Sequence, residues 1–226
     1  MREINILGLS LRDYTMREKM RMLDSYLGRR TMAIVGFVSA RALMQAEKEV
    51  RQKEWLESMD VVEYCDADIL RAAGITARGR LKEAENGSFL KGLRQWLIRE
   101  HHPVYLLAGS EDVMQMLEAD AEIAQMHVTG KNILPQENGS DIDVIINDIN
   151  DKAPCAVLVH ADCLLQAAFV DASRQKVNAD IWVGLPEKSM APGDTDRKFA
   201  GFIKNMQRRL FQRKVHQYEN QEKAEP

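Results

Sequence analysis

Short apolar runs are the sequence feature that most constrains the fold of this chain. The clearest are Val104–Ala108, Ala156–Val159 and Ala179–Val183, each about as long as one strand. A strand that is apolar at almost every position, rather than at every second one, is typical of a sheet covered on both faces. Segments with helical character at 110–122 and 164–176 lie between these runs. The alternation predicts an α/β fold with a mostly parallel sheet and helices on both faces.

The first half of the chain shows the same alternation. A strand is expected over Ile4–Leu9, and Thr15-Met16-Arg17-Glu18 then has the pattern of a capping box, in which the Thr and Glu side chains satisfy backbone donors at a helix start. An apolar run at Met32–Val38 predicts a second strand, and a helix is expected from Ala40 to Met59. The other expected elements are strands at 61–64 and 126–130, helices at 69–73, 88–99 and 142–150, and a loop region at 74–87.

Composition and charge exclude several classes of function. A formal net charge of -3 gives no general electrostatic basis for binding nucleic acid. The cysteines, Cys65, Cys155 and Cys163, are irregularly spaced and form no CxxC pair, so neither a disulfide framework nor a zinc site is expected. The sequence has no recognisable signal peptide and no apolar stretch of about 20 residues, the length that spans a bilayer. We therefore expect a cytoplasmic protein that binds no metal.

The C-terminal segment has the pattern of a basic amphipathic helix from Arg197 to Tyr218. Such a helix can lie on an anionic membrane surface, or it can pack its apolar stripe on the domain and leave its basic face in solvent. We expect an α/β domain over residues 1–195, a basic helical appendage over 196–218 and a frayed polar tail over 219–226. The stripe consists of Phe199, Phe202, Ile203, Met206 and Leu210, and the basic residues are Arg197, Lys198, Lys204, Arg208, Arg209, Arg213 and Lys214.

Strand-to-helix turns hold the candidate site residues, because ligands of open α/β sheets bind outside the carboxyl ends of the strands. Gly109 and Ser110 precede a helix whose N–H groups could hold a diphosphate, although a glycine is also common in a plain turn. Asp66 and Asp68 follow the third strand, where a carboxylate could take a proton from an attacking hydroxyl or could cap the next helix. His160, together with Asp162, could be a base or a ligand, but a histidine at a strand end is more often structural. The order of elements is Rossmann-like without a GxGxxG or Walker A spacing.

Several sequence landmarks, taken together, point to a known family. They are Ile6-Leu7-Gly8-Leu9, Thr15-Met16-Arg17-Glu18, a helix at 43–60 that leads into a strand and Asp66, and Val104–Gly109. In these landmarks the chain resembles the WecG/TagA/CpsF glycosyltransferase family over nearly its whole length. The resemblance implies transfer of a hexose or N-acetylhexosamine from a nucleotide-diphosphate sugar to a polyprenyl-diphosphate-linked acceptor, in the synthesis of surface polysaccharide or teichoic-acid-type polymers. It implies no cofactor and no metal.

The resemblance also assigns roles to residues that match the family's motifs. Asp66 matches the proposed base of a Pro-Asp-Gly turn. Gln166 is retained from a Gly-x-Gly-x-Pro-Lys-Gln-Glu turn and Gly184 from the glycine-rich turn that follows, so both are expected around the sugar donor together with Gly109 and Ser110. The basic residues expected near the acceptor phosphate or the membrane are Arg208, Arg209 and Arg213.

Other motif positions depart from the family's pattern. The Thr-x-Asn turn is replaced by Gly36-Phe37-Val38, and the Arg-Ala-Pro segment by Lys198-Phe199-Ala200. Apolar side chains cannot supply the hydrogen bonds and charge that a diphosphate requires. The alternative is therefore a noncatalytic relative that keeps the scaffold as a binding or regulatory protein. For an active enzyme the expected partners are a nucleotide-diphosphate sugar, a lipid-linked acceptor and the anionic inner face of a membrane, and a homo-oligomer is left open.

Overall fold

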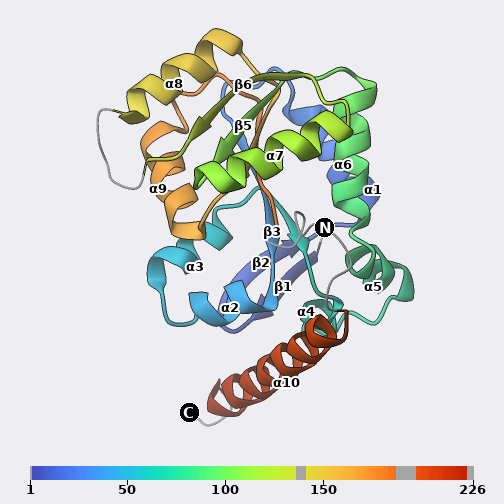
Figure 1. The fold of residues 1–226 in the computed structure, drawn as a ribbon. Coiled ribbons are helices and arrows are strands. Elements are labelled where there is room, and N and C mark those ends of the chain that lie inside the picture. The colour runs from blue at the N-terminus through green and yellow to red at the C-terminus, as the bar shows by residue number, and fades with distance from the viewer. Residues whose placement is uncertain (1, 136–140, 187–196, 223–226) are drawn as a thin grey trace.

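A six-stranded parallel sheet forms the centre of the protein (Figure 1). The computed structural model describes residues 2–135, 141–186 and 197–222, including the side chains of all of these except 141, 197–207 and 222. Within these residues the strand order is β4-β3-β8-β7-β5-β6, and every neighbouring pair is parallel. The α/β fold with a parallel sheet is confirmed. The strands are β3 (Ala33–Val38), β4 (Val61–Tyr64), β5 (Val104–Ala108), β6 (Val128–Ile133), β7 (Ala156–His160) and β8 (Ile181–Gly184).

Helices cover both faces of this sheet, and successive strand residues point to opposite faces. In β5, Val104 and Leu106 pack into one apolar cluster, whereas Tyr105 and Leu107 pack into the other. None of these four side chains is exposed, which explains why the strand is apolar at every position. One face is covered by α1 (Met16–Tyr26), α6 (Ser88–Arg99) and α7 (Glu111–Ile123), and the other by α2 (Ala40–Ala46), α3 (Val50–Glu57), α8 (Asp141–Lys152) and α9 (Cys163–Ser173).

The single strand expected over Ile4–Leu9 is wrong, because the chain reverses direction inside it. β1 (Arg2–Ile6) and β2 (Leu9–Asp13) pair antiparallel as a hairpin, separate from the central sheet. The two turn residues, Leu7 and Gly8, have φ angles of 50° and 73°. Positive φ at both positions gives the twist that a two-residue hairpin turn needs. β2 contacts β4, so the hairpin lies beside one edge of the sheet.

The capping box before α1 is confirmed. The N–H of Glu18 donates to Thr15 Oγ1 at 3.3 Å, and the N–H of Thr15 donates to Glu18 Oε2 at 2.8 Å. The backbone hydrogen bond from Thr15 is the largest of the contacts that lower the pKa of the Glu18 carboxyl. Each side chain satisfies a donor that the first turn would otherwise leave unbonded, which fixes where α1 begins.

The single helix expected from Ala40 to Met59 is also wrong, because the chain bends between α2 and α3. α2 contacts the C-terminal helix, whereas α3 contacts β2 and α9. One straight helix could not reach both sets of partners. Gln52 Nε2 of α3 donates to the carbonyl of Ala42 at 3.1 Å and holds the two helices together across the bend.

The region expected to be a loop at 74–87 contains a further helix, α5 (Arg78–Glu85), so that expectation is wrong. A shorter helix, α4 (Ala67–Ala72), precedes it and confirms the helix expected at 69–73 within two residues. α5 has no side-chain cap, and its buried Arg80 bonds to Asp13 of β2. Because that partner lies far away in the sequence, local periodicity carries no sign of the contact.

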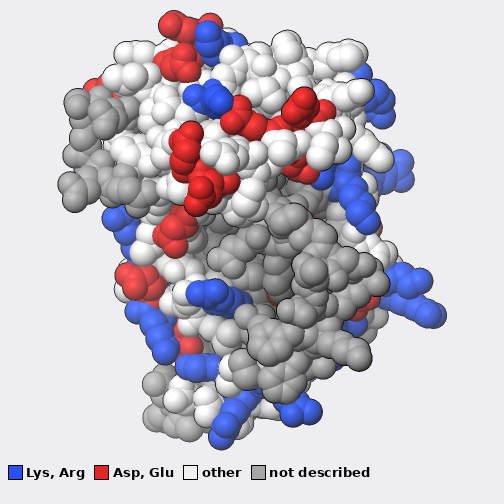
Figure 2. Space-filling model, viewed as in Figure 1, with Lys and Arg blue, Asp and Glu red and all other residues white. Residues whose placement is uncertain are grey.

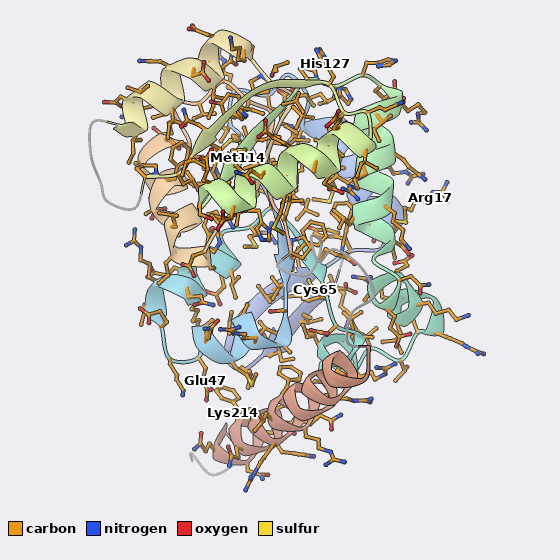
Figure 3. The ribbon with its side chains drawn as sticks, in the orientation of Figure 1. Arg17, Glu47, Cys65, Met114, His127 and Lys214 are labelled. Carbon is orange, nitrogen blue, oxygen red and sulfur yellow. The ribbon has the colours of Figure 1, made fainter. Side chains whose placement is uncertain are left out.

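The C-terminal helix is present as α10 (Arg197–Glu222), and it continues past the expected end at Tyr218. Phe211 is fully buried, Val215 and Tyr218 pack against the core, and Lys214 Nζ lies 2.8 Å from Glu47 Oε2. This part of α10 therefore packs on the domain, as Figure 3 shows for Lys214 and Glu47. Among the described residues no helix has the length and apolar character to cross a bilayer. Of the expected apolar stripe, Leu210 is 49% exposed. The other four stripe residues lie outside the described side chains, and they are Phe199, Phe202, Ile203 and Met206.

Candidate active site

A cavity of about 480 Å³ opens at the carboxyl ends of β3, β4 and β8. Its walls come from the β3–α2 turn, the start of α4, the end of α5, the start of α9 and α10. Cys65, which follows β4 and lies in the middle of the view in Figure 3, borders this cavity. On the molecular face seen in Figure 2, acidic side chains gather over α7, while lysines and arginines are spread along both edges and the lower end. The structure therefore places a hollow where the sheet topology predicts a ligand site.

Asp66 borders this cavity from the turn between β4 and α4. It stands at the N-cap position of α4, but its side chain makes no capping bond there. Instead, Asp66 Oδ2 accepts the N–H of Ala40 at the first turn of α2, at 3.3 Å. The carboxylate is thus fixed between two strand-to-helix turns and remains partly exposed. An ionised side chain held in this way can accept a proton from a hydroxyl group bound in the cavity.

Among the described side chains of α10, Arg208 is the basic one that borders the cavity. Its Nε atom lies 3.1 Å from Asp68 Oδ2, while Arg71 Nη1 lies 2.9 Å from Asp68 Oδ1. Arg71 Nη2 in turn lies 2.7 Å from Glu85 Oε1, and Glu85 also borders the cavity. α10 is therefore tied to α4 and α5 by a chain of ion pairs along the cavity rim.

Gln166 and Gly184 meet in the wall of the same cavity. The Gln166 side chain is buried, its Nε2 donates to the carbonyl of Ala161 at 2.9 Å, and its Oε1 accepts from Trp182 Nε1 at 3.3 Å. A Cβ atom on Gly184 would lie only 2.6 Å from Gln166 Oε1. The glycine is therefore required by the position of the Gln166 amide, whose contacts are largely within the protein.

The other predicted residues lie elsewhere. Gly109 borders a second cavity of about 860 Å³, at the carboxyl ends of β5 and β7. Ser110 caps α7, since its Oγ accepts the N–H of Val113 at 3.5 Å. Arg209 and Arg213 are exposed on α10 and border neither cavity. The structure thus brings together Asp66, Gln166, Gly184 and Arg208, and separates them from Gly109, Ser110, Arg209 and Arg213.

Sequence reasoning missed three charged residues of the first cavity, which are Arg41, Glu63 and Glu85. Arg41 lies in the first turn of α2 and borders the cavity with an exposed side chain. Glu63 lies on β4, is 2% exposed, and its Oε2 forms an ion pair with the fully buried Lys19 Nζ of α1. Burial lowers the pKa of the Lys19 ammonium group, and the charge of Glu63 opposes that shift. The available signal was a charged residue inside an otherwise apolar strand, since such residues are buried almost solely when paired.

The sequence matches the model of the glycosyl transferase WecG/TagA/CpsF family over residues 4–186. No curated protein matches the chain. The matched region includes the whole sheet and most of the first cavity, and it ends two residues after β8. The fold and the sequence match thus define the same class of protein, an α/β protein with a cavity at the carboxyl edge of its parallel sheet. The chain belongs to the WecG/TagA/CpsF family of glycosyl transferases, whose members transfer sugars in the synthesis of polysaccharides and teichoic acids.

Proposed function

We propose that this protein transfers a hexose or N-acetylhexosamine from a nucleotide-diphosphate sugar to a polyprenyl-diphosphate-linked acceptor. The observation that carries the proposal is the placement of Asp66, whose carboxylate is held by the Ala40 N–H in the wall of a cavity at the carboxyl edge of the sheet. Ligands of α/β proteins bind at this edge, and a glycosyl transfer needs a proton acceptor there.

In the proposed reaction, an acceptor hydroxyl attacks the anomeric carbon of the donor sugar. The bond from that carbon to the diphosphate oxygen breaks, and the electron pair leaves with the nucleoside diphosphate. Asp66 takes the proton of the attacking hydroxyl. Arg41 and Arg208 border the cavity and carry the positive charge that suits a departing diphosphate.

Different observations bear on the other residues that are expected around the sugar donor. Gly184 makes room for the Gln166 amide in the cavity wall, and Gln166 fixes that wall through its bonds to Ala161 and Trp182. The roles of Gly109 and Ser110 stay a prediction, which requires the donor to extend into the second cavity. Ala161 and Leu185 border both cavities, so the two are adjacent.

A noncatalytic relative is the second candidate. It is favoured because polar groups of the cavity already have partners within the protein. The Gln166 amide bonds within the protein, and Arg208 is engaged by Asp68. In this case the cavity would hold a ligand without turning it over, and the protein would act as a binding or regulatory partner.

Calorimetry with UDP and UDP-sugars at millimolar concentration tests the proposal. We expect saturable binding, weakened about tenfold by Arg41→Ala, because a hydrogen bond to a charged group is lost. Arg209→Ala, which removes an exposed arginine outside both cavities, serves as the matched control and should bind like the unchanged protein. Absence of any saturable signal with the unchanged protein would remove the main support for the transferase. Binding without turnover on a lipid-linked acceptor would instead support the noncatalytic candidate.

The proposed place of action is the cytoplasmic face of the cell membrane, where a lipid-linked acceptor would be found. Arg209, Leu210 and Arg213 are exposed on the outer side of α10 and could contact anionic headgroups. Replacing both arginines by alanine should weaken the free energy of binding to anionic vesicles by about 1 kcal/mol for each charge. The loss would be seen as a smaller fraction of protein that sediments with the vesicles. Lys91→Ala on α6 removes an exposed charge from another helix and should have no effect. Equal sedimentation of all three proteins would leave α10 with the packing role alone.

A further inference from the structure

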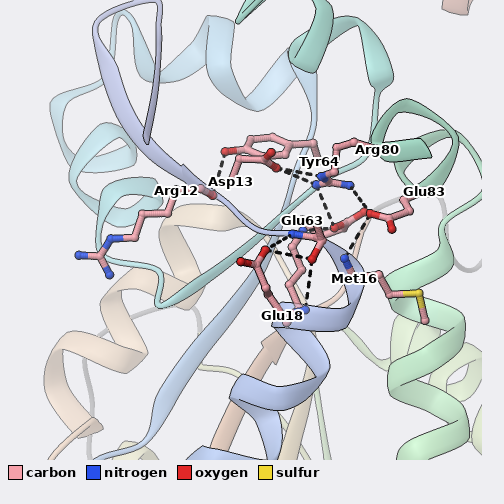
Figure 4. Close-up of polar contacts among 10 residues, drawn as sticks. Arg12, Asp13, Met16, Glu18, Glu63, Tyr64, Arg80 and Glu83 are labelled. Atoms are coloured by element: carbon pink, nitrogen blue, oxygen red, sulfur yellow. Dashed lines mark hydrogen bonds and ion pairs between the residues drawn. The ribbon is translucent and has the colours of Figure 1, made fainter. Parts of the chain in front are cut away.

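Beside the candidate active site, the protein buries a cluster of charged side chains where α1, β2, β4 and α5 meet (Figure 4). Lys19, Glu63, Arg80 and Asp13 are 0%, 2%, 6% and 9% exposed. Arg80 Nε donates to Asp13 Oδ1 at 3.0 Å, and Glu83 Oε2 lies 3.4 Å from Arg80 Nη1. Removing so many charges from water is costly, and the cost is offset only where the charged groups find partners.

One oxygen of this cluster has no partner after the internal contacts are counted. Glu63 Oε1 is buried and has no hydrogen-bond partner within the part of the chain that the structure describes. Arg80 Nη2 lies 3.0 Å from Asp13 Oδ1 and 3.7 Å from Glu63 Oε2, so its contacts are with the carboxylates of the cluster. Buried polar atoms are nearly always bonded in native proteins, and exceptions mark places that a water or a ligand group completes.

Glu63 is also the member of the cluster that borders the cavity. It is aligned with Phe37 in the pairing of β3 with β4, close to the carboxyl ends of both strands. Phe37 and Val35 of β3 border the cavity as well. The ion pair with Lys19 engages Oε2 of Glu63, which leaves Oε1 as the oxygen that can serve a ligand.

We propose that Glu63 recognises a hydroxyl group of the sugar in the cavity, through a hydrogen bond that the hydroxyl donates to Oε1. The inference deepens the proposed function, on which it rests for the presence of a sugar. A hydroxyl group can donate a hydrogen bond, and Glu63 Oε1 is an acceptor that has no partner among the described residues. Lys19 and Arg80 act as positioning residues, because Lys19 Nζ pairs with Glu63 Oε2 and Arg80 Nη2 lies 3.7 Å from the same oxygen.

This recognition would make the cavity selective. An ionised carboxylate only accepts hydrogen bonds, so a ligand must present an O–H or N–H group at this point. A sugar that lacks the group would leave the buried acceptor unbonded, which is a large penalty in a protein interior. The cavity should therefore distinguish one hydroxyl position of the sugar from the others.

The test measures binding of free hexoses and N-acetylhexosamines to the full chain by ligand-observed NMR, with UDP measured separately. Glu63→Gln should weaken the tightest-binding sugar by about tenfold or more and leave UDP binding unchanged. Glu83→Gln is the matched control, since Glu83 pairs with Arg80 but does not border the cavity. In addition, one member of a monodeoxy series of that sugar should bind about tenfold more weakly to the unchanged protein. That series keeps the proposal testable if Glu63→Gln fails to fold.

The outcomes separate this inference from the proposed function. Sugar binding that depends on Glu63, without any binding of UDP, would support the hydroxyl site and contradict the transferase. UDP binding together with a sugar affinity that Glu63→Gln and the monodeoxy series leave unchanged would overturn the hydroxyl site, and Glu63 would then bond to a water only. Absence of sugar binding to the unchanged protein would overturn it as well.

Discussion

The two neighbouring cavities at the carboxyl edge of the sheet differ in how their polar groups are used. In the first, Asp66 and Glu63 are acids set in the wall, and Glu63 Oε1 has no hydrogen-bond partner among the described residues. Beside the second, Ser110 and Asp162 cap α7 and α9 by accepting N–H groups at 3.5 and 2.9 Å. Backbone N–H groups at the starts of these two helices are therefore bonded by side chains of the protein itself. A place at a strand end is therefore not enough for a ligand site, because polar groups must remain after the fold's own needs are met.

The largest effect is expected from the acid that follows β4. Asp66→Asn should lower kcat by about 10²–10⁴-fold, because it removes the proton acceptor, and leave the affinity for the sugar donor unchanged. Asp162→Asn changes the equivalent acid beside the second cavity, and it should leave kcat unchanged because Asp162 serves as the cap of α9. Steady-state kinetics on both variants make the comparison. Unaltered turnover in Asp66→Asn would remove Asp66 from the role of base.

The glycines of the two cavities give the next effect. Gly184→Ala places a Cβ atom 2.6 Å from Gln166 Oε1, which is fixed by its bond from Trp182. The crowding should lower the free energy of unfolding by about 1–3 kcal/mol. Gly109→Ala meets Ala161 Cβ at 3.3 Å, a milder contact, so its loss should be smaller. Urea denaturation of both variants measures the difference, and equal losses would contradict the packing difference between the two turns.

Removal of the α7 cap should have an effect on stability alone. Ser110→Ala should lower the free energy of unfolding by about 1 kcal/mol. Ser39→Ala removes the corresponding cap of α2 beside the first cavity and provides the reference for that loss. Calorimetry should find UDP affinity unchanged in Ser110→Ala. A weaker UDP affinity would mean that the sugar donor extends into the second cavity. Both cavities would then belong to the ligand site.

The smallest effect is expected at the capping box, which lies outside both cavities. The pKa of Glu18 is lowered in the folded state, chiefly by the backbone hydrogen bond from Thr15, so its stabilisation is present above the unfolded pKa and is lost as the pH falls. Glu18→Gln should therefore cost about 0.5 kcal/mol near neutral pH, and the difference from the unchanged protein should shrink below about pH 4. Thermal unfolding between pH 3 and 7 gives the measurement. A difference that is constant over this range would contradict the role of the Glu18 charge.

How well the sequence predicted the fold depended on whether an element is held by local or distant contacts. β5 was predicted with its observed bounds and α6 likewise, since continuous apolar runs and strong amphipathic spacing are local signals. The hairpin turn at Leu7 was missed, because only Gly8 of the two turn residues is typical of such turns. α5 was missed because its buried Arg80 is held by Asp13, 67 positions away in the chain.

The candidate site divides in the same way. Asp66 follows β4, Gly184 ends β8 and Gln166 lies near the start of α9. The topology alone brought these three residues to one cavity. Glu63 lies within a strand, so a search of the turns did not include it. The carboxylate of Glu63 is buried in an ion pair with Lys19. That pair exists only because α1 packs against β4, and the sequence alone does not show this packing. Charge networks that join distant segments are therefore the part of the site that sequence patterns reveal least.

The position of α10 has a consequence for the biogenesis of the protein. During synthesis the N-terminal segments leave the ribosome first, so the hairpin and the sheet can fold before α10 emerges. Phe211 of α10 borders the first cavity, and the Tyr218 hydroxyl lies against Gly8 of the hairpin turn. A wall of the cavity that is synthesised later thus docks on a hairpin that is synthesised earlier. The pocket of a nascent protein would stay open until α10 has left the ribosome, and ligand binding would begin only after this helix has docked.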